Sequence, residues 1–347
     1  MLNVVAIGGG TGLSTLLRGL KRHVARESEP EDPGPKIDCL TAIVTVSDDG
    51  GSSGRLRRDF GVTPPGDIRN CMTALSDDEA LLSRLFRFRF SGGQGLEGHN
   101  FGNLFLVALA EVTGDFTEAV KLSSAILKTR GDIFPATTSN VRLLALMDDG
   151  SHVRGETNIT ASNRRIVKLK LVPWNAKPLP QTIHAIEQAD LITVGPGSLF
   201  TSLVPNLLVR GISEAIAASK ATKVFVCNLM TQANESLDLT ASQHVEALCG
   251  HGRCKLFDYA MLNSTPVPPE MREKYAASNA SPIVNDVEEL EKMGVTPILG
   301  DYLDNSPIAR HNAIRIANDL LELTAKNRQR SQAEQTRGTM MVDAIRK

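Results

Sequence analysis

The sequence has few aromatic residues and almost no net charge. Its 347 residues include one Trp, three Tyr and eleven Phe, and 38 Lys and Arg balance 39 Asp and Glu, which leaves a formal net charge of −1. Proteins that bind duplex nucleic acid need a basic surface to displace counterions, and those that bind single strands stack bases on aromatic side chains. The composition therefore argues against nucleic acid as a partner and favours a small ligand.

Cysteine is scarce and shows no framework spacing. An odd count of five fits a reducing compartment and not a disulfide-linked fold. Cys249 and Cys254 lie close together with His244 and His251 nearby, but a zinc site usually has two ligand pairs and the second is missing. We therefore expect these cysteines to be small apolar side chains beside a helix end, without a metal.

Long hydrophobic runs are also missing. The amino terminus, Met1 to Ile7, has neither a basic segment nor a long apolar segment, so it does not resemble a signal peptide. The most apolar stretch, residues 101–112, contains polar residues and is too short for a membrane span. The sequence predicts a cytoplasmic protein with no membrane-spanning segment.

An alternation of strands and helices begins at the amino terminus. Residues 2–7 form a short β-branched run that ends in glycines, leucines then recur with helical spacing over 13–20, and residues 39–46 form a second apolar run. Strand, glycine turn, helix and strand make a βαβ unit, which predicts a parallel sheet covered on both faces. The expected fold class is α/β: a Rossmann-like, doubly wound, mostly parallel sheet with a smaller inserted helical and β-hairpin part.

The rest of the chain continues this pattern with one interruption. Residues 141–172 alternate apolar and polar side chains around a turn, which predicts β-hairpin structure with one face in solvent. We expect one domain over 1–325, with an insertion around 60–172, and a polar tail over 326–347 that is frayed or disordered. The other predicted elements are helices over 81–86, 103–112 and 116–127, strands near 190–194, 223–227 and 297–300, and a last helix that begins near Pro307.

A glycine-rich segment, Gly8-Gly9-Gly10-Thr11-Gly12-Leu13, lies between the first predicted strand and helix. Glycines let a ligand approach the backbone, and a helix N-terminus offers unpaired N–H groups to phosphate. The dinucleotide pattern G-x-G-x-x-G fails because Leu13 takes its third glycine position, and the Walker pattern fails because no Gly-Lys-Ser/Thr follows. A bare glycine turn is the alternative to phosphate binding. The candidate residues are Gly9, Gly10, Thr11, Gly12 and Leu13.

A second segment repeats this arrangement farther along the chain. Residues 194–203 place a Gly/Ser turn between an apolar strand and a helix, so a second helix N-terminus would face the same crevice and suit a pyrophosphate. Amide and hydroxyl groups after the next strand suit a nucleobase or sugar, and an arginine near the last helix suits a phosphate. These candidate nucleotide-binding residues are Gly195, Pro196, Gly197, Ser198, Asn228, Thr231, Gln232 and Arg310.

Two adjacent acidic residues follow the second predicted strand. Ligands of open parallel sheets bind beyond the carboxyl ends of the strands, so this loop should face the first glycine-rich segment. Neighbouring carboxylates near phosphate favour Mg²⁺, which prefers oxygen ligands, whereas a turn with a helix cap is the alternative. Asp48 and Asp49 are therefore candidate Mg²⁺ ligands. The candidate substrate or metal loop comprises Ser47, Asp48, Asp49, Gly50 and Ser52.

Two further polar segments lie within the expected insertion. In the first, Pro64-Pro65-Gly66 fixes a turn, after which Asp67 is expected to cap the next helix and Arg69 is a candidate ligand contact. In the second, residues 98–103 place asparagines and a histidine before an apolar helix. Substrate contact is favoured there over a purely structural role, and the candidates are Asn100 and Asn103.

Several of these segments together resemble one known family. The segments at 5–14, 46–54, 65–69, 98–103 and 195–199 look like those of the bacterial gluconeogenesis factor family. That family is similar to the 2-phospho-L-lactate transferases of coenzyme F420 biosynthesis. The resemblance spans roughly residues 2–320, and it leaves out the loop at 25–36 and the polar tail.

The resemblance implies a Rossmann-like sheet and binding of a nucleotide sugar of the UDP-N-acetylglucosamine type. It also implies a role in cell shape and wall synthesis during growth on gluconeogenic carbon sources. The similar transferases move a phospholactyl group from a guanylylated donor to a deazaflavin, with Mg²⁺. A homo-oligomer and a regulated protein partner are both compatible with the sequence.

Two hypotheses about function follow. The first is a cytoplasmic regulatory protein that binds a UDP-sugar. The alternative is a Mg²⁺-dependent transferase of a phosphorus-containing group, in which the metal neutralises charge on the transferring group. No Ser-His-Asp or Cys-His arrangement is legible in the sequence, and an oxidoreductase is less favoured because the third fingerprint glycine is missing.

Overall fold

The protein is organised around one parallel sheet, as a computed structural model of residues 1–25, 34–76, 81–162, 164–233 and 235–345 describes it. The sheet has seven strands in the order β10-β9-β8-β7-β1-β2-β3, and every pairing is parallel. The predicted doubly wound α/β fold is therefore confirmed. The strands are β1 (Leu2–Gly8), β2 (Ile37–Val44), β3 (Asp132–Pro135), β7 (Leu191–Val194), β8 (Thr222–Val226), β9 (Tyr259–Asn263) and β10 (Thr296–Gly300).

Helices cover both faces of this sheet, because its strands are apolar on both sides. In β1, Val4 and Ala6 pack into one hydrophobic cluster, whereas Val5 and Ile7 pack into another on the opposite face. The first cluster is completed by α1 (Gly10–Leu20), α3 (Gly66–Leu75), α4 (Leu81–Arg87), α5 (Phe101–Thr113), α6 (Phe116–Leu127) and α14 (Ala313–Ile345). The second is completed by α8 (Pro180–Gln188), η2 (Leu199–Leu203), α9 (Val204–Leu207), α10 (Ile212–Ala218), α11 (Ala241–Gly252) and α13 (Val287–Lys292).

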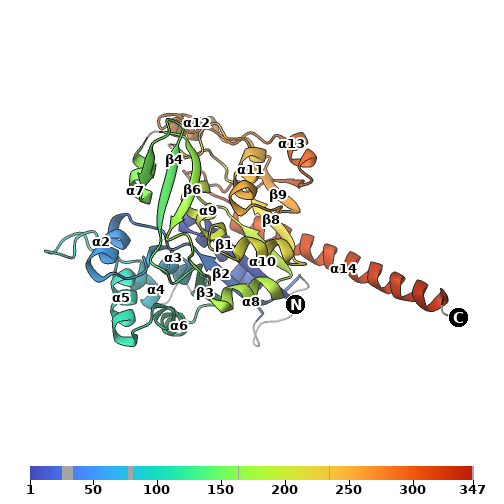
Figure 1. The fold of residues 1–347 in the computed structure, drawn as a ribbon, viewed down its shortest axis with the longest axis horizontal. Coiled ribbons are helices and arrows are strands. Elements are labelled where there is room, and N and C mark those ends of the chain that lie inside the picture. Colours follow the sequence, from blue (N-terminus) through green and yellow to red (C-terminus); the bar gives the residue numbers. More distant parts are fainter. Residues whose placement is uncertain (26–33, 77–80, 163, 234, 346–347) are drawn as a thin grey trace.

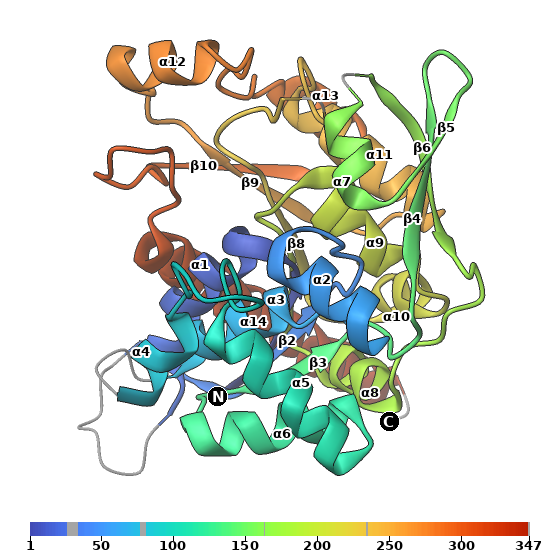
Figure 2. The same ribbon diagram turned by 90° about the vertical axis from the view of Figure 1, so that its left-hand side faces the viewer.

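A small antiparallel sheet stands at one flank of the molecule, beside α7 and α11 (Figure 2). Its order is β5-β4-β6, with β4 in the centre, which confirms the hairpin structure predicted for 141–172. The inner face of this sheet packs into the same hydrophobic cluster as α11. Its strands are β4 (Arg142–Met147), β5 (His152–Arg154) and β6 (Ile166–Val172), and the remaining helices are η1 (Lys21–His23), α2 (Gly51–Phe60), α7 (Glu156–Ala161) and α12 (Pro269–Ala276).

The structure differs from the sequence predictions at several elements, among them the helices α2, α7, α8 and α10–α13, for which no range was predicted. Strands β3 and β9 were not expected, and the last helix begins at Ala313 instead of near Pro307. The helix starts later because Asn312 caps it by accepting a hydrogen bond from the Arg315 N–H at 3.2 Å.

The last helix also extends through much of the predicted tail. Residues 326–345 continue α14, which projects from the body of the molecule (Figure 1). The division into one domain and a separate tail stays a prediction. Among the described residues, no helix is both long enough and apolar enough to cross a membrane.

Candidate functional site

The two glycine loops lie side by side at the carboxyl end of the sheet. Strand β1 has β2 on one side and β7 on the other, so the chain winds outward in both directions from the β1–β7 boundary. Crevices for ligands form at such a boundary. A side chain at Gly12 would overlap the carbonyl group of Pro196, so the loops after β1 and β7 pack directly against each other. The structure thus brings together the two loops that the sequence predicts to share one crevice.

The first loop already holds a carboxylate of the protein. Helix α1 begins at Gly10, whose N–H donates to the Asp67 carboxylate, and an added Cβ at Gly9 would lie 2.7 Å from Asp67 Oδ2. Thr11 and Gly12 belong to the same first turn, where N–H groups have no partner within the helix. The sequence predicted that Asp67 caps α3, and this prediction is wrong. Pro65 is the cap residue of α3, no side chain caps this helix, and Asp67 lies within its first turn.

The second loop is joined to the loop that follows β8. The Gly197 N–H donates to Asn228 Oδ1 at 3.0 Å, and Asn228 Nδ2 donates back to the Gly197 carbonyl at 2.7 Å. Gln232 Nε2 donates to Ser198 Oγ at 2.9 Å, and Thr231 Oγ1 accepts from the Ser281 N–H at 2.9 Å. Asn228 and Gln232 therefore tie the loop after β8 to the second glycine loop and form a rim beside it, whereas Thr231 is bonded to Ser281.

Glu235 is a site residue that sequence reasoning missed. Its carboxylate accepts hydrogen bonds from the N–H groups of Phe200 and Thr201, at 2.7 and 2.8 Å, at the start of η2. Burial raises its pKa above the usual range. A carboxylate of the protein thus binds two donors of the turn that the sequence predicts to bind pyrophosphate. The signal was weak because Glu235 follows a strand by several residues in an irregular segment.

The two adjacent acidic residues after β2 have different partners. Asp48 Oδ1 accepts from the Gly50 N–H at 2.8 Å, and burial raises the pKa of Asp48. Asp49 accepts from the Glu156 N–H at 3.0 Å and from the Thr157 N–H and hydroxyl at 2.9 and 2.8 Å. Asp49 therefore attaches the start of α7 to the crevice, while Asp48 makes fewer bonds.

The floor of the crevice is acidic. Burial, reinforced by the Asp48 charge, raises the pKa of Asp67 to about 6, and burial together with the charges of Asp48, Asp67 and Glu235 raises the pKa of Glu156 to about 9. Glu156 is the second residue that sequence reasoning missed, because it belongs to the inserted hairpin. Negative charges held this close favour protonation or a bound cation.

Neither the acidic floor nor the cysteine region forms a ready-made metal site. Within the described ranges, no three side chains of His, Cys, Asp or Glu converge as ligands for one ion. A cation on the acidic floor would therefore complete its coordination with oxygen atoms from a ligand, as Mg²⁺ does with substrate phosphates.

The segment before α5 is held by internal hydrogen bonds. Ser52 Oγ lies 3.0 Å from His99 Nδ1, and Asn100 caps α5 by accepting from the Asn103 N–H at 3.3 Å. Arg69 Nε donates to Asn103 Oδ1 at 3.3 Å, and burial lowers the Arg69 pKa to about 10. Ser52 and His99 are both buried, so this pair fixes the loop in place. Ligand contact by Arg69, Asn100 and Asn103 stays a prediction.

Arg310 lies at the edge of the same crevice. It is exposed and precedes α14 by three residues. His311 Nε2 donates to the Cys227 carbonyl at 2.9 Å, which fixes this loop next to Asn228 at the end of β8. The loop that carries Arg310 is therefore near the rim described above, and a contact of Arg310 with an anion stays a prediction.

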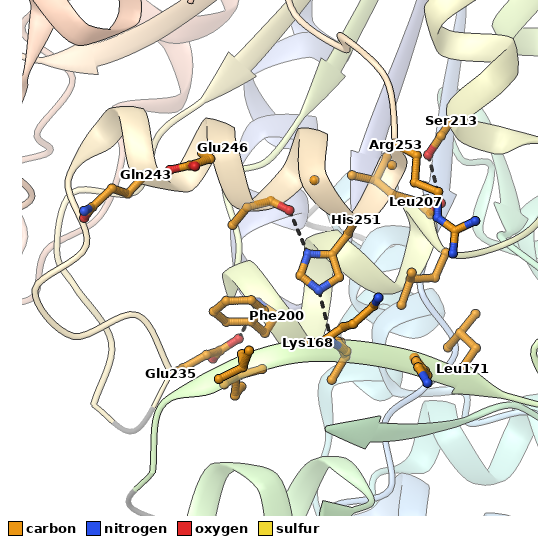
Figure 3. Close-up of a pocket in the computed structure, with 18 of the residues that line it drawn as sticks. Lys168, Leu171, Phe200, Leu207, Ser213, Glu235, Gln243, Glu246, His251 and Arg253 are labelled. Carbon is orange, nitrogen blue, oxygen red and sulfur yellow. Dashed lines mark hydrogen bonds between the residues drawn. The ribbon is translucent and has the colours of Figure 1, made fainter. Parts of the chain in front are cut away.

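A cavity of about 1410 Å³ opens beside the crevice, between β6 and α11 (Figure 3). Phe200 and Glu235 line one end of it, so it shares these two residues with the second glycine loop. His251 reaches across from α11 toward β6. This cavity could not be predicted from the sequence, because it depends on how the small sheet packs against α11.

Comparison with known proteins places the chain in a family. The family model for the 2-phospho-L-lactate transferase CofD matches residues 4–303. The chain belongs to this family. The resemblance noted from the sequence is thereby confirmed.

Relatives named gluconeogenesis factor are also similar to this chain. The Bacillus subtilis protein is 46% identical over 321 residues, which cover 92% of this chain and 97% of the relative. The Halalkalibacterium halodurans protein is 44% identical, with 92% and 96% covered. A crystal structure of a Bacillus halodurans protein superposes with a TM-score of 0.87 at 42% identity, covering 92% of this chain and 99% of that one.

Proposed function

We propose that the crevice binds a nucleoside diphosphate or its ester together with a divalent cation. The observation that carries this proposal is a group of acidic residues beside the start of α1: the Gly10 N–H donates to Asp67, whose pKa is raised by the charge of Asp48, and both of these acidic residues raise the pKa of Glu156. At neutral pH Glu156 is protonated, but Asp67, with a pKa of about 6, is ionised and would repel a diphosphate at the start of α1. A cation between the two removes this repulsion and satisfies both.

The cation that fits these residues is Mg²⁺. It is usually held by one or two carboxylates and by phosphate oxygens, and it keeps several waters. Asp48 and Asp49 are the proposed ligands. Both carboxylate oxygens of Asp49 already accept hydrogen bonds from α7, whereas only one oxygen of Asp48 accepts a backbone hydrogen bond, so Asp48 is the more available ligand. When bound, the metal would neutralise charge on the phosphate oxygens.

The family to which the chain belongs supports a transfer reaction at this site. In such a reaction an acceptor hydroxyl attacks the outer phosphorus of a nucleotide diphosphate ester, the bridging P–O bond breaks, and a nucleoside monophosphate leaves. The acceptor loses its proton to a base. N–H groups at Thr11 and Gly12 would orient the phosphates, while Asn228 and Arg310 would contact the rest of the nucleotide.

A second candidate is a regulatory protein that binds a UDP-N-acetylglucosamine type of nucleotide sugar and supports cell shape under gluconeogenic growth. One observation favours it: relatives that match over 92% of the chain are named for gluconeogenesis and not for a transfer reaction. The same rim of amide and hydroxyl groups would hold the uridine or sugar in this case.

A product assay separates the two candidates. The full chain is incubated with a nucleotide diphosphate ester, an acceptor alcohol and Mg²⁺, and nucleoside monophosphate is measured by liquid chromatography. Magnesium-dependent release supports the transferase. Ligand-dependent stabilisation in a thermal melt without any product supports the regulator, and neither product nor stabilisation at millimolar ligand overturns both.

A further inference from the structure

One edge of the small antiparallel sheet has no partner strand. Strand β6 pairs with β4 on one side, and among the described residues no strand pairs with its other side. The Leu169 N–H donates to His251 Nε2 at 3.0 Å, so Leu169 presents its backbone to this open side. Because antiparallel pairing alternates along a strand, Leu171 presents its backbone groups to the same side, whereas the register shift at Val167 interrupts the alternation there.

The open edge faces the cavity described above. Residues 164–171 form one wall of it, and the end of α11 forms the other (Figure 3). Its volume of about 1410 Å³ exceeds the range of about 300–1,000 Å³ that is typical of small-molecule clefts. A sheet edge without a partner strand along such a cavity suits an extended peptide, which adds to the edge as a further strand.

His251 supplies a hydrogen-bond acceptor for the open edge of β6, as a partner strand would. Its Nδ1–H donates to the Ala247 carbonyl at 2.7 Å, so the neutral ring leaves Nε2 to accept from Leu169. An acceptor thus stands at the place where the carbonyl of an added strand would stand. The imidazole satisfies this one donor while the edge is vacant.

The side chains of β6 specify the chemistry of the added segment. Lys168 and Lys170 are exposed on the outer face, whereas Leu169 and Leu171 are buried on the inner face. An added strand would therefore place acidic residues opposite the lysines and apolar residues toward the cavity. A second copy of β6 is disfavoured, because antiparallel pairing would set Lys168 opposite Lys170 of the copy.

Further features at one end of the cavity agree with this assignment. Arg210 and Arg253 are exposed there and make no described ion pair. Trp174, the single tryptophan of the chain, follows β6 and is 75% exposed. Aromatic residues and arginines are the usual anchors of protein interfaces.

We infer that the open edge of β6 binds an extended segment of a partner protein in which acidic and apolar residues alternate. The segment adds to the small sheet as a fourth strand, displaces the His251 contact at Leu169, and lies between β6 and α11. This inference does not depend on which nucleotide the crevice binds. Glu235 lines the same cavity, so the bound segment would lie next to the loop that follows β8.

The test uses the single tryptophan as its reporter. A capped peptide Glu-Val-Glu-Val-Glu-Val-Glu, which lacks aromatic residues, is titrated into the full chain while Trp174 emission is followed. Two control peptides carry lysine in place of glutamate, or N-methyl groups on every second amide. We expect the acidic peptide to bind at least about tenfold more tightly than either control, because the controls lose cross-strand charge pairs or backbone hydrogen bonds.

Charge reversal in the protein gives the matched variant. Lys168→Glu combined with Lys170→Glu changes two exposed side chains, so an unchanged thermal melt is expected to show that the fold is intact. This variant should bind the acidic peptide about tenfold more weakly and should now bind the lysine peptide. The inference is overturned if no peptide changes Trp174 emission at about 1 mM, or if N-methylation or charge reversal leaves the affinity of the acidic peptide unchanged.

Discussion

At the scale of single residues, carboxylates hold the backbone of the crevice in place. Asp67 binds the Gly10 N–H, Glu235 binds two N–H groups of η2, and Asp49 binds the start of α7. Each bond places a negative charge where a helix start favours one. The cost is a concentration of negative charge, which a cation would offset.

Asp67 should make the stability of the protein depend on pH. Its pKa is about 6 in the folded chain against 3.8 in the unfolded chain. Between these values the folded state binds a proton that the unfolded state does not, so the free energy of unfolding falls as pH rises from about 4 to 6. Asp67→Asn should remove this part of the loss, on the order of 1–2 kcal/mol.

Urea unfolding in EDTA across this pH range measures the effect. Asp38→Asn, which changes an exposed aspartate in β2, is the matched control and should follow the wild type. An Asp67→Asn profile with the same slope as the wild type would show that Asp67 ionises as freely in the folded chain as in the unfolded one.

Residues with a clear local pattern could be predicted, and residues from irregular segments could not. The glycines after β1 and β7 and the Asp48-Asp49 pair directly follow apolar strands, which is why the sequence located them at one edge of the sheet. Glu156 and Glu235 reach the same crevice through long-range packing of the insertion and of the segment after β8. No local spacing encodes such contacts.

At the scale of elements, the contact between α1 and the loop after β7 sets the shape of the crevice. Gly12 permits that contact, because a side chain there would overlap Pro196. This gives a structural reason for the glycine in addition to any closeness to phosphate. A substitution at Gly12 is therefore expected to lower the stability of the fold, whether or not a ligand is bound.

Gly12→Ala should destabilise the protein by about 1–3 kcal/mol, because the added methyl group forces two backbone segments apart. Gly250→Ala is the matched control: it also lies within a helix, and nothing lies within 4 Å of an added Cβ. This control should be neutral or more stable by up to about 1 kcal/mol. Equal unfolding midpoints for the two variants in a denaturant titration would contradict the close packing of the two loops.

Asp49→Ala should loosen α7 and destabilise the protein by about 1–2 kcal/mol, since it removes the acceptor for three hydrogen bonds. Asp115→Ala removes the cap of α6, whose Oδ1 accepts from the Glu118 N–H at 2.8 Å, far from the crevice. Both should lose stability, but only Asp49→Ala should speed hydrogen exchange over residues 155–161. Unchanged exchange there would contradict the attachment of α7 by Asp49.

Most elements could be predicted because periodicity identified them. The helices over 81–86, 103–112 and 116–127 and the strands β1, β2, β7, β8 and β10 all appear near the expected ranges. The strands β3 and β9 were missed because β3 contains an Asp and a Pro and β9 contains no β-branched residue, so neither has the composition typical of a strand. Their position is set by pairing with β2, β8 and β10, which is a tertiary effect.

At the scale of the whole molecule, two sites lie next to each other. The first lies at the carboxyl ends of the paired strands β1 and β7, where their two glycine loops meet. The second is the cavity beside β6, where the small sheet meets α11. Phe200 and Glu235 lie between them, because both residues line the cavity and belong to the hydrogen-bonded start of η2. The insertion therefore supplies a second surface to a sheet that would otherwise carry one site.

The most direct test of the central claim is calorimetric titration of UDP-N-acetylglucosamine, and then of GDP, into the full chain with Mg²⁺ and with EDTA. We expect Mg²⁺ to tighten binding of at least one of them by about tenfold, which is about 1.4 kcal/mol, and Asp48→Asn to remove most of this gain. Affinities that are equal with Mg²⁺ and with EDTA, or no heat of binding for either nucleotide, would contradict it.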